Sequence, residues 1–246
     1  MKVQYLFKNH KGRDFVCGDI HGCFELLDEK LSEVSFNPQS DRLFSVGDII
    51  DRGPDSEKAL HYLQQKWFYC IRGNHEQMML DWCTEYTSVF RNDAFRFHVH
   101  NGGLWVADYL GISIQKLSEE MLLDEPIAER YPELNRWINA INKLPYAIEI
   151  KSPRKKIGII HAEIPERINW PSLEAELNKP SVLYSILFSR KYIHSRKRKN
   201  YHIKGIDEVY SGHTVVETPQ QVGNISYIDT GAYSNQNLTL IELNYS

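Results

Sequence analysis

Hydrophobic residues in the first third of the chain fall into short runs separated by longer amphipathic stretches. The runs at 15–17, 43–46 and 68–71 are typical of buried strands, whereas 23–34, 55–65 and 76–83 have the periodicity of helices. In the first of these helices the apolar positions form one stripe: Phe24, Leu27, Leu31 and Val34. This regular alternation predicts βαβ units and neighbouring parallel strands.

The middle of the chain, about 85–144, has a helical pattern and predicts a helical insertion between the two strand-rich parts. Its clearest apolar positions step by four and three residues: Ile127, Tyr131, Leu134, Ile138 and Ile141. This spacing predicts one amphipathic helix with its apolar stripe against the core.

The last hundred residues have a β pattern. Segments 146–150 and 156–160 predict a hairpin around Ser152 and Pro153, and short strands are predicted within 208–212, 225–229 and 238–243. The chain contains no repeat, low-complexity tract or obvious linker. We therefore expect a single domain over 1–246, of the α/β class, with two packed β-sheets flanked by helices.

Polar side chains follow five of the predicted strands, at the ends where the chain leaves the sheet. These residues are Asp19, His21, Asp48, Asn74, His161 and His213. Ligands of open α/β sheets bind beyond the carboxyl ends of the strands. Any one of these residues alone would ordinarily be a hydrogen-bonded polar residue, but the convergence of six indicates a site.

The chemistry of this set predicts metal binding. Three imidazoles, two carboxylates and one amide oxygen are too many for one tetrahedral ion, but suit two divalent ions that share a carboxylate, roughly 3.5–4 Å apart. Mixed nitrogen and oxygen ligands without a thiolate favour Mn, Fe or Zn.

Further residues beside this set suit a phosphate ester. Arg52 and Arg72 flank the ligands, and a guanidinium is a planar fork of donors that matches phosphate oxygens. His75 follows Asn74 directly, and Asp51 lies three residues after Asp48. Since a nearby carboxylate favours imidazolium, His75 could donate a proton to a leaving alkoxide.

At these residues the chain resembles a known family. The blocks "GDIHG", "GDIIDRGPDS" and "RGNHEQMM", followed by "HAE", "SGHT" and "YIDTGA", resemble the metallophosphoesterase phosphoprotein phosphatases, in particular the compact phage-lambda and bacterial serine/threonine branch. The resemblance covers about 15–243. It implies a calcineurin-like metallophosphoesterase fold, a β-sandwich with helices outside, and a dinuclear metal centre commonly active with Mn²⁺.

The resemblance also implies a division of the ligands between two metals. Asp19 and His21 would hold one ion, and Asp48 would bridge to the other. The second ion would have three further ligands: Asn74, His161 and His213. A water activated by the metals would attack phosphorus in line, opposite the leaving serine or threonine oxygen.

The remaining roles follow from the same resemblance. Arg52 and Arg72 would bind the phosphoryl oxygens, and Arg190 in "LFSRKYI" best matches a third phosphate-binding arginine of the family. His75, oriented by Asp51, would protonate the leaving group. These residues predict a metal-dependent serine/threonine phosphoprotein phosphatase, with phosphotyrosine as a further candidate substrate.

Two departures and several alternatives accompany this prediction. Glu163 stands where relatives often have Asp or Gly, and the Ser-Ala-Pro-Asn-Tyr motif of the eukaryotic branch is absent, so that branch's regulatory subunits are not implied.

A symmetrical diadenosine tetraphosphate hydrolase is the nearest alternative, but that branch tends to have Ala where this chain has Asp51. A metallo-nuclease or phosphodiesterase is disfavoured by the "DRG" and "RGNHE" pairing. A non-catalytic interaction module should have lost ligands or His75.

Composition limits the partners and the location. Lys plus Arg number 29 and Asp plus Glu 32 in 246 residues, so the net charge of −3 makes nucleic acid an improbable partner. No apolar run has the length of a membrane span, and the start lacks the apolar core of a signal peptide. Four cysteines without CxxC spacing predict reduced thiols in a cytoplasmic protein: Cys17, Cys23, Cys70 and Cys83.

Several remaining features receive no catalytic role. The basic run Arg196–Lys199 is typical of a solvated loop. Asp229 ends a predicted strand and is interpreted as structural support. His98 and His100, beside an Asn-Gly-Gly segment, stay unassigned.

Overall fold

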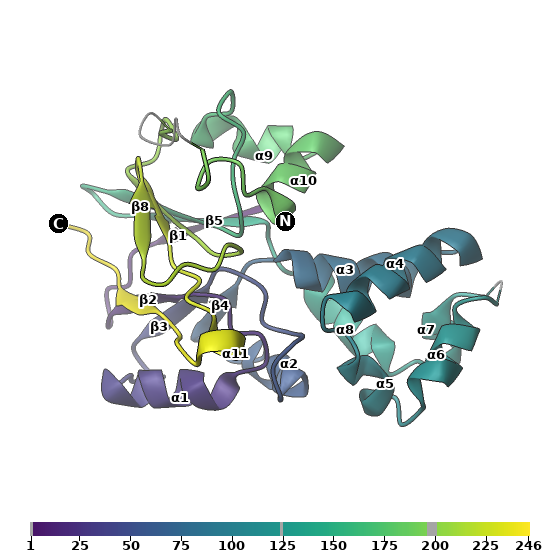
Figure 1. The fold of residues 1–246 in the computed structure, drawn as a ribbon. Helices are drawn as coiled ribbons and strands as arrows, with labels where there is room; N and C mark the ends of the chain where they lie inside the picture. Colours follow the sequence, from purple (N-terminus) through teal and green to yellow (C-terminus); the bar gives the residue numbers. More distant parts are fainter. Residues whose placement is uncertain (1, 124, 196–200) are drawn as a thin grey trace.

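Two mixed β-sheets pack face to face in the computed structural model, which describes residues 2–123, 125–195 and 201–246 (Figure 1). The six-stranded sheet has the order β1 (Val3–Phe7), β5 (Ala147–Lys151), β6 (Lys156–Ile160), β7 (Glu208–Ser211), β9 (Ile225–Tyr227) and β8 (Gln220–Val222). The four-stranded sheet has the order β10 (Leu240–Glu242), β2 (Asp14–Cys17), β3 (Arg42–Ser45) and β4 (Phe68–Cys70). The predicted fold class of two packed sheets flanked by helices is confirmed.

The direction of the strands determines where their polar ends lie. In the four-stranded sheet β2, β3 and β4 run parallel, and in the six-stranded sheet β6, β7 and β9 run parallel. The strands β5 and β6 form the predicted antiparallel hairpin. A hydrogen bond joins the ends of the two sheets. The backbone N–H of His213, after β7, donates to the carboxylate of Asp19, after β2, at 3.0 Å.

Apolar side chains from both sheets form the core between them. Its buried members are Val16, Phe44, Val46, Ile71, Ile148, Ile150, Ile157, Ile159, Tyr210, Ile228 and Leu243. Burying one such aliphatic side chain contributes about 1.5–3 kcal/mol. The strands that carry the polar ends are therefore held rigidly from both sides.

Helices cover the outer faces of both sheets. The helices α1 (Phe24–Glu33) and α2 (Ala59–Tyr62) lie against the four-stranded sheet, and α9 (Leu173–Glu176) and α10 (Pro180–Phe188) lie against the six-stranded sheet (Figure 1). Three of the four positions of the predicted α1 stripe are buried in the helix, and Val34 follows it as its C-cap. A short helix, α11 (Ala232–Asn235), precedes β10.

The predicted helical insertion is confirmed, and it forms a lobe beside the sandwich (Figure 1). Its helices are α4 (Ser88–His100), α5 (Trp105–Tyr109), α6 (Ile114–Glu120), α7 (Ile127–Arg130) and α8 (Leu134–Asn142). The helix α3 (Asn74–Thr84), which the alternation of the first third predicts, leads from the four-stranded sheet into this lobe. The prediction of one continuous helix over 127–141 is wrong. Pro132 disfavours helical backbone at Tyr131, which has φ −125° and ψ 78°, so the segment divides there.

Some elements were not predicted from the sequence. The edge strand β1, the three-residue strand β8 and the helices α9 and α10 had no clear periodic signal. The basic run Arg196–Lys199 lies outside the described residues. Within the described part of the chain, no helix is both long and apolar enough to cross a membrane.

Candidate active site

The polar strand ends converge at one edge of the sandwich. Asp19 and His21 follow β2, Asp48 follows β3, and Asn74 opens helix α3 four residues after the end of β4. His161 and His213 follow β6 and β7 in the other sheet. All six side chains are buried.

Strained backbone is concentrated at this edge. Five non-glycine residues of the site have φ between 46° and 70°: His21, Asp48, Asp51, Arg52 and His213. Such a left-handed conformation costs a non-glycine residue of order 1–3 kcal/mol and persists where the surroundings enforce it, commonly at functional sites.

The carboxylate of Asp48 lies at the centre of the site. Its Oδ2 atom is 3.4 Å from Nε2 of His161, 3.7 Å from Nε2 of His21 and 3.8 Å from Nε2 of His75. Its Oδ1 atom accepts the backbone N–H of His75 at 2.9 Å. Burial alone would raise the pKa of Asp48, but the surrounding imidazoles, His161 first, hold that pKa well below its usual range.

Two of the imidazoles are oriented by backbone carbonyls. Nδ1 of His21 lies 2.8 Å from the carbonyl oxygen of Ile50, and Nδ1 of His161 lies 2.8 Å from that of Val46. Each ring therefore presents Nε2 to the site, an arrangement typical of metal-ligating histidine. Burial lowers the pKa of His21 to about 3, which favours the neutral form that binds metals.

The second cluster gathers around the amide of Asn74. Its Oδ1 atom is 2.8 Å from Nε2 of His161 and 2.7 Å from Nδ1 of His213. The buried Nε2 atom of His213 has no hydrogen-bond partner among the described residues. Burial, then the charge of His161, lowers the pKa of His213 to about 2. A neutral imidazole nitrogen without a partner fits a metal ligand.

Two ligand groups share Asp48. His21, Asp48 and His75 form one, and Asp48, His161 and His213 form the other, each with candidate ligand atoms within 4.8 Å of one another. Asp19 belongs to neither group, whereas His75, which the resemblance makes an acid, lies in the first.

Acidic side chains accumulate around Asp19. Burial, then the charges of Asp229 and Asp48, raises the pKa of Asp19 well above its usual range. Burial also raises the pKa of Asp229, which therefore contributes to the electrostatics of the site and not to structural support alone. Buried carboxylates that repel one another are stabilised by a cation, so this donor set fits divalent metals.

Two glycines allow this close packing. A Cβ atom at Gly73 would lie 2.1 Å from Oδ1 of Asp48, and one at Gly212 would lie 2.0 Å from Oδ1 of Asp19. Neither position has room for a side chain while the carboxylates keep their places.

The buried carboxylate of Glu76 organises the loop of Asp48, a role that the sequence analysis missed. Its Oε1 atom accepts the backbone N–H groups of Ile49 at 2.9 Å and Ile50 at 3.4 Å. Its Oε2 atom accepts those of Asp48 at 3.0 Å and Gly73 at 2.8 Å. The position of Glu76 inside "RGNHEQMM" was the available signal.

Asp51 and His75 form a close buried pair. Nδ1 of His75 lies 2.6 Å from Oδ2 of Asp51. The same oxygen lies 2.8 Å from Nε2 of His98, and the indole N–H of Trp105 donates to Oδ1 at 2.7 Å. Burial would raise the pKa of Asp51, but His98 and His75 keep it below its usual range. Sequence reasoning left His98 unassigned and missed Trp105.

The arginines have different surroundings. Arg52 is exposed, and its Nη1 donates to Nε2 of His21 at 3.1 Å while its guanidinium lies 4.8 Å from the ring centre of Tyr233. Arg72 is buried and donates to three protein groups: the side chains of Gln77 and Tyr146 and the carbonyl of Ile141. The guanidinium of Arg72 is therefore already engaged by the helical lobe.

Arg190 is exposed and contacts the site at His213. Its Nη2 atom donates to the carbonyl oxygen of His213 at 3.1 Å. The loop of Arg190 is held by the buried carboxylate of Glu163, which accepts the backbone N–H groups of Lys191, Tyr192 and Ile193 at 2.8–3.2 Å. Glu163, which stands where relatives often have Asp or Gly, therefore anchors the loop that carries Arg190.

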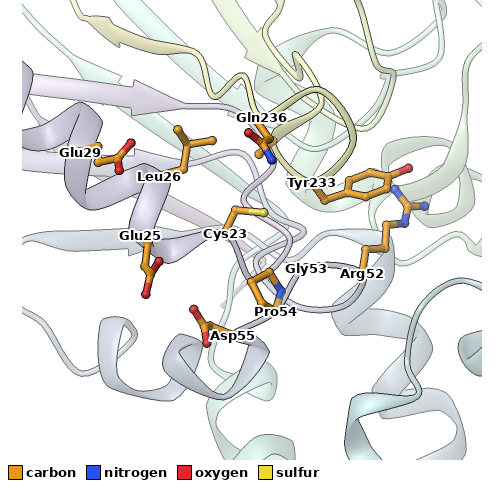
Figure 2. A pocket seen from close by; sticks show the side chains of 11 residues that line it. Cys23, Glu25, Leu26, Glu29, Arg52, Gly53, Pro54, Asp55, Tyr233 and Gln236 are labelled. Carbon is orange, nitrogen blue, oxygen red and sulfur yellow. The ribbon is translucent and has the colours of Figure 1, made fainter.

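A cavity of about 550 Å³ opens beside the site. Arg52 and Tyr233 lie on one side of it, and Cys23, Glu25 and Asp55 line it further away (Figure 2). Tyr233 also contacts His21, with ring centres 5.2 Å apart. The cavity therefore adjoins the ligand groups through Arg52 and Tyr233.

Comparison with known proteins agrees with this geometry. The family model described as "Calcineurin-like phosphoesterase" matches residues 15–217. This chain belongs to the calcineurin-like phosphoesterase family. It is a metallophosphoesterase, and members of the family use a dinuclear divalent metal site.

Individual members of the family differ in activity. The chain is 33% identical to "Serine/threonine-protein phosphatase 1" of Salmonella typhimurium over 93% of its own length and 91% of the relative. It is 43% identical to a symmetrical "Bis(5'-nucleosyl)-tetraphosphatase" of Pseudomonas syringae over 27% of its length and 23% of the relative. A crystal structure titled as a putative diadenosine tetraphosphatase has a TM-score of 0.60 at 19% identity, covering 100% of this chain and 99% of that one, and shows the shared fold.

Proposed function

We propose that this metallophosphoesterase is a serine/threonine phosphoprotein phosphatase that hydrolyses phosphate monoesters on proteins or peptides. The observation that carries the proposal is the buried pair of Asp51 and His75, 2.6 Å apart, beside two ligand groups that share Asp48. A relative named as such a phosphatase matches nearly the whole chain. Phosphotyrosine is a further candidate substrate, because the proposed acid acts on any leaving oxygen.

The proposed cofactors are two divalent ions, with Mn²⁺ first and Fe or Zn as alternatives. Asp19 and His21 would hold one, and Asn74, His161 and His213 the other, with Asp48 between them. When bound, such ions activate water for attack on phosphorus and neutralise phosphoryl charge. The orphan Nε2 atom of His213 and the crowded carboxylates support this assignment.

The proposed roles of the protein's own groups concern the leaving oxygen and the phosphoryl oxygens. His75 protonates the serine or threonine oxygen as the bond to phosphorus breaks, and Asp51 keeps the ring oriented through Nδ1. Arg52 is exposed at the cavity and Arg190 is exposed beside His213, and each could bind a phosphoryl oxygen. The Nη atoms of Arg72 are held by Gln77, Tyr146 and Ile141. Its buried Nε atom has no hydrogen-bond partner among the described residues, so Nε is the donor that Arg72 could offer to a phosphoryl oxygen.

Symmetrical hydrolysis of a dinucleoside tetraphosphate is the second candidate. Its support is the relative from Pseudomonas syringae, although the match covers about a quarter of each chain. Asp51 favours the phosphatase, since His75 then has a carboxylate partner. A non-catalytic module is disfavoured because the complete ligand set and the acid pair are present.

Location and organisation belong to the proposal as well. Four free cysteines, of which three are buried, support the reducing environment of the cytoplasm. We expect action as one domain over 1–246, since the sequence has no obvious linker. A regulatory subunit is not implied, because the Ser-Ala-Pro-Asn-Tyr motif of the eukaryotic branch is missing from the sequence.

Phosphate release tests the proposal directly. We would compare a phosphoserine peptide with diadenosine tetraphosphate, each with Mn²⁺ and with chelator. Turnover of the peptide alone, and only with Mn²⁺, is the expected result. Turnover of the dinucleotide alone would replace the proposal with the second candidate. His75→Asn should lose peptide turnover while binding metal normally, and unchanged turnover would remove His75 from its role.

A further inference from the structure

One segment of the helical lobe, residues 98–105, from the last turn of α4 to the start of α5, contacts Asp51 and Arg52 (Figure 1). His98 and Trp105 contact the Asp51 carboxylate from this segment. The backbone of the same segment accepts from Arg52, whose N–H lies 3.3 Å from the carbonyl of Gly102. The lobe therefore contacts the residues at 51 and 52 that the proposed chemistry uses.

The contacts of His98 determine where its proton is. The indole N–H of Trp82 donates to Nδ1 of His98 at 2.9 Å, so Nδ1 must carry a lone pair. The proton of the neutral ring therefore lies on Nε2, which is 2.8 Å from Oδ2 of Asp51 and donates to it. Trp82, His98 and Asp51 are completely buried, so each donor and acceptor depends on this arrangement.

The Asp51 carboxylate is held by three side-chain donors on two oxygens. Oδ2 accepts from His98 and His75, and Oδ1 accepts from Trp105. With both oxygens engaged, the carboxylate cannot rotate without breaking a buried hydrogen bond. The direction of the lone pair offered to Nδ1 of His75 is fixed accordingly.

The packing leaves little room for another arrangement. A Cβ atom at Gly103 would lie 2.5 Å from the ring of His98, so the chain approaches the imidazole as closely as a glycine allows. His100 differs, since it lies two residues further on the same helix and is exposed. This pair of histidines therefore provides a buried residue and a matched exposed control.

We propose that His98 and Trp105 are positioning residues of the reaction: they fix Asp51, and through Asp51 they aim the His75 ring at the leaving oxygen. This inference rests on the proposed function, because it presumes that His75 is the acid. It assigns the helical lobe a role in leaving-group protonation. A purely structural role would affect all substrates equally.

Leaving-group dependence separates these cases. Phenyl phosphate has a leaving group with a pKa of about 10, like tyrosine, and needs an acid, whereas 2,4-dinitrophenyl phosphate has a far more acidic leaving group and does not. His75→Asn, assayed first with Mn²⁺, should lose phenyl phosphate turnover selectively. Equal loss on both substrates would refute the acid role of His75, on which this inference rests, before the positioning variants are considered. Absence of turnover of either phosphate by the wild type would instead refute the proposed function.

Two variants of His98 differ by one methylene. His98→Gln can accept from Trp82 and still reach Asp51, whereas His98→Asn can accept from Trp82 but is too short to reach Asp51. We expect His98→Asn to lower kcat on phenyl phosphate about tenfold or more, part of the 10²–10⁴ that general acids contribute, with 2,4-dinitrophenyl phosphate changed less than about twofold. His98→Gln should retain most of the wild-type kcat on phenyl phosphate, and His100→Gln should match the wild type on both substrates.

The second donor keeps the test decisive. Trp105→Phe removes the N–H to Oδ1 from a half-buried position and should produce the same selective loss, even where His98→Asn does not fold. One outcome would refute the positioning role while the proposed function stands. In it, His75→Asn loses turnover of phenyl phosphate selectively, but His98→Asn and Trp105→Phe lower turnover of both substrates equally or leave both unchanged.

Discussion

Replacement of Glu76 by glutamine tests whether one buried carboxylate holds the Asp48 loop. Each oxygen of Glu76 accepts two backbone N–H groups, so either orientation of an amide leaves two N–H groups facing an NH₂ donor. An unsatisfied buried donor costs about 1–3 kcal/mol, which predicts a loss of about 2–6 kcal/mol. Burial and the charge of Asp48 raise the pKa of Glu76, and relief of this repulsion offsets part of the loss. We expect a net loss of about 2–4 kcal/mol.

Urea unfolding of the metal-free protein measures this change in the free energy of unfolding. For a chain of this length about 1 kcal/mol corresponds to 2–4 °C in Tm, so thermal unfolding should agree. Exposed Glu57 provides the control, since Glu57→Gln should change stability by less than about 0.5 kcal/mol. A loss below about 1 kcal/mol for Glu76→Gln would show that the four contacts do not hold the loop.

Three further predictions concern thiols, metals and an ion pair. Burial raises the pKa of Cys17 to about 12, and it raises those of Cys70 and Cys83 well above the ordinary value. Only half-buried Cys23 should therefore react with a thiol reagent in the native protein, faster at higher pH because the thiolate reacts. More than one reactive thiol in the native protein would contradict this, and Cys23→Ser should abolish native labelling. Mn²⁺ at 100 times its Kd should stabilise the protein by about 2.7 kcal/mol for each ion bound, or about 5–11 °C in Tm per ion, and an equal shift in Asp48→Asn would exclude Asp48 as a shared ligand. The buried carboxylate of Asp14 pairs with Nε and Nη2 of Arg42 at 2.7 and 2.9 Å. Asp14→Ala should therefore lower the free energy of unfolding, measured by urea unfolding, by about 3–5 kcal/mol. A change under about 1 kcal/mol would show that the pair contributes little to stability.

The N-terminal alternation was predictable because hydrophobic periodicity reports burial on one face of an element. It predicted β2, β3 and β4 and the stripe of α1, and it placed Asp19, Asp48 and Asn74 at strand ends. Hydrophobic periodicity failed where the buried residues do not recur at a regular spacing along one continuous element. β1 lies at a sheet edge with Tyr5 and Phe7 exposed, and the stripe over 127–141 continued across a proline that the helix could not include.

The candidate site divides in the same way. The sequence alone determined which residue types stand at the strand ends and which family they resemble, because motif residues are contiguous and their chemistry is local. Only the tertiary structure decided that Glu76 holds the Asp48 loop, that Arg72 is engaged by the lobe and that His98 and Trp105 hold Asp51. His98 and Trp105 are 47 and 54 residues from Asp51 along the chain. A hydrogen bond across such separations depends on packing of whole elements, and no local pattern in the sequence records it.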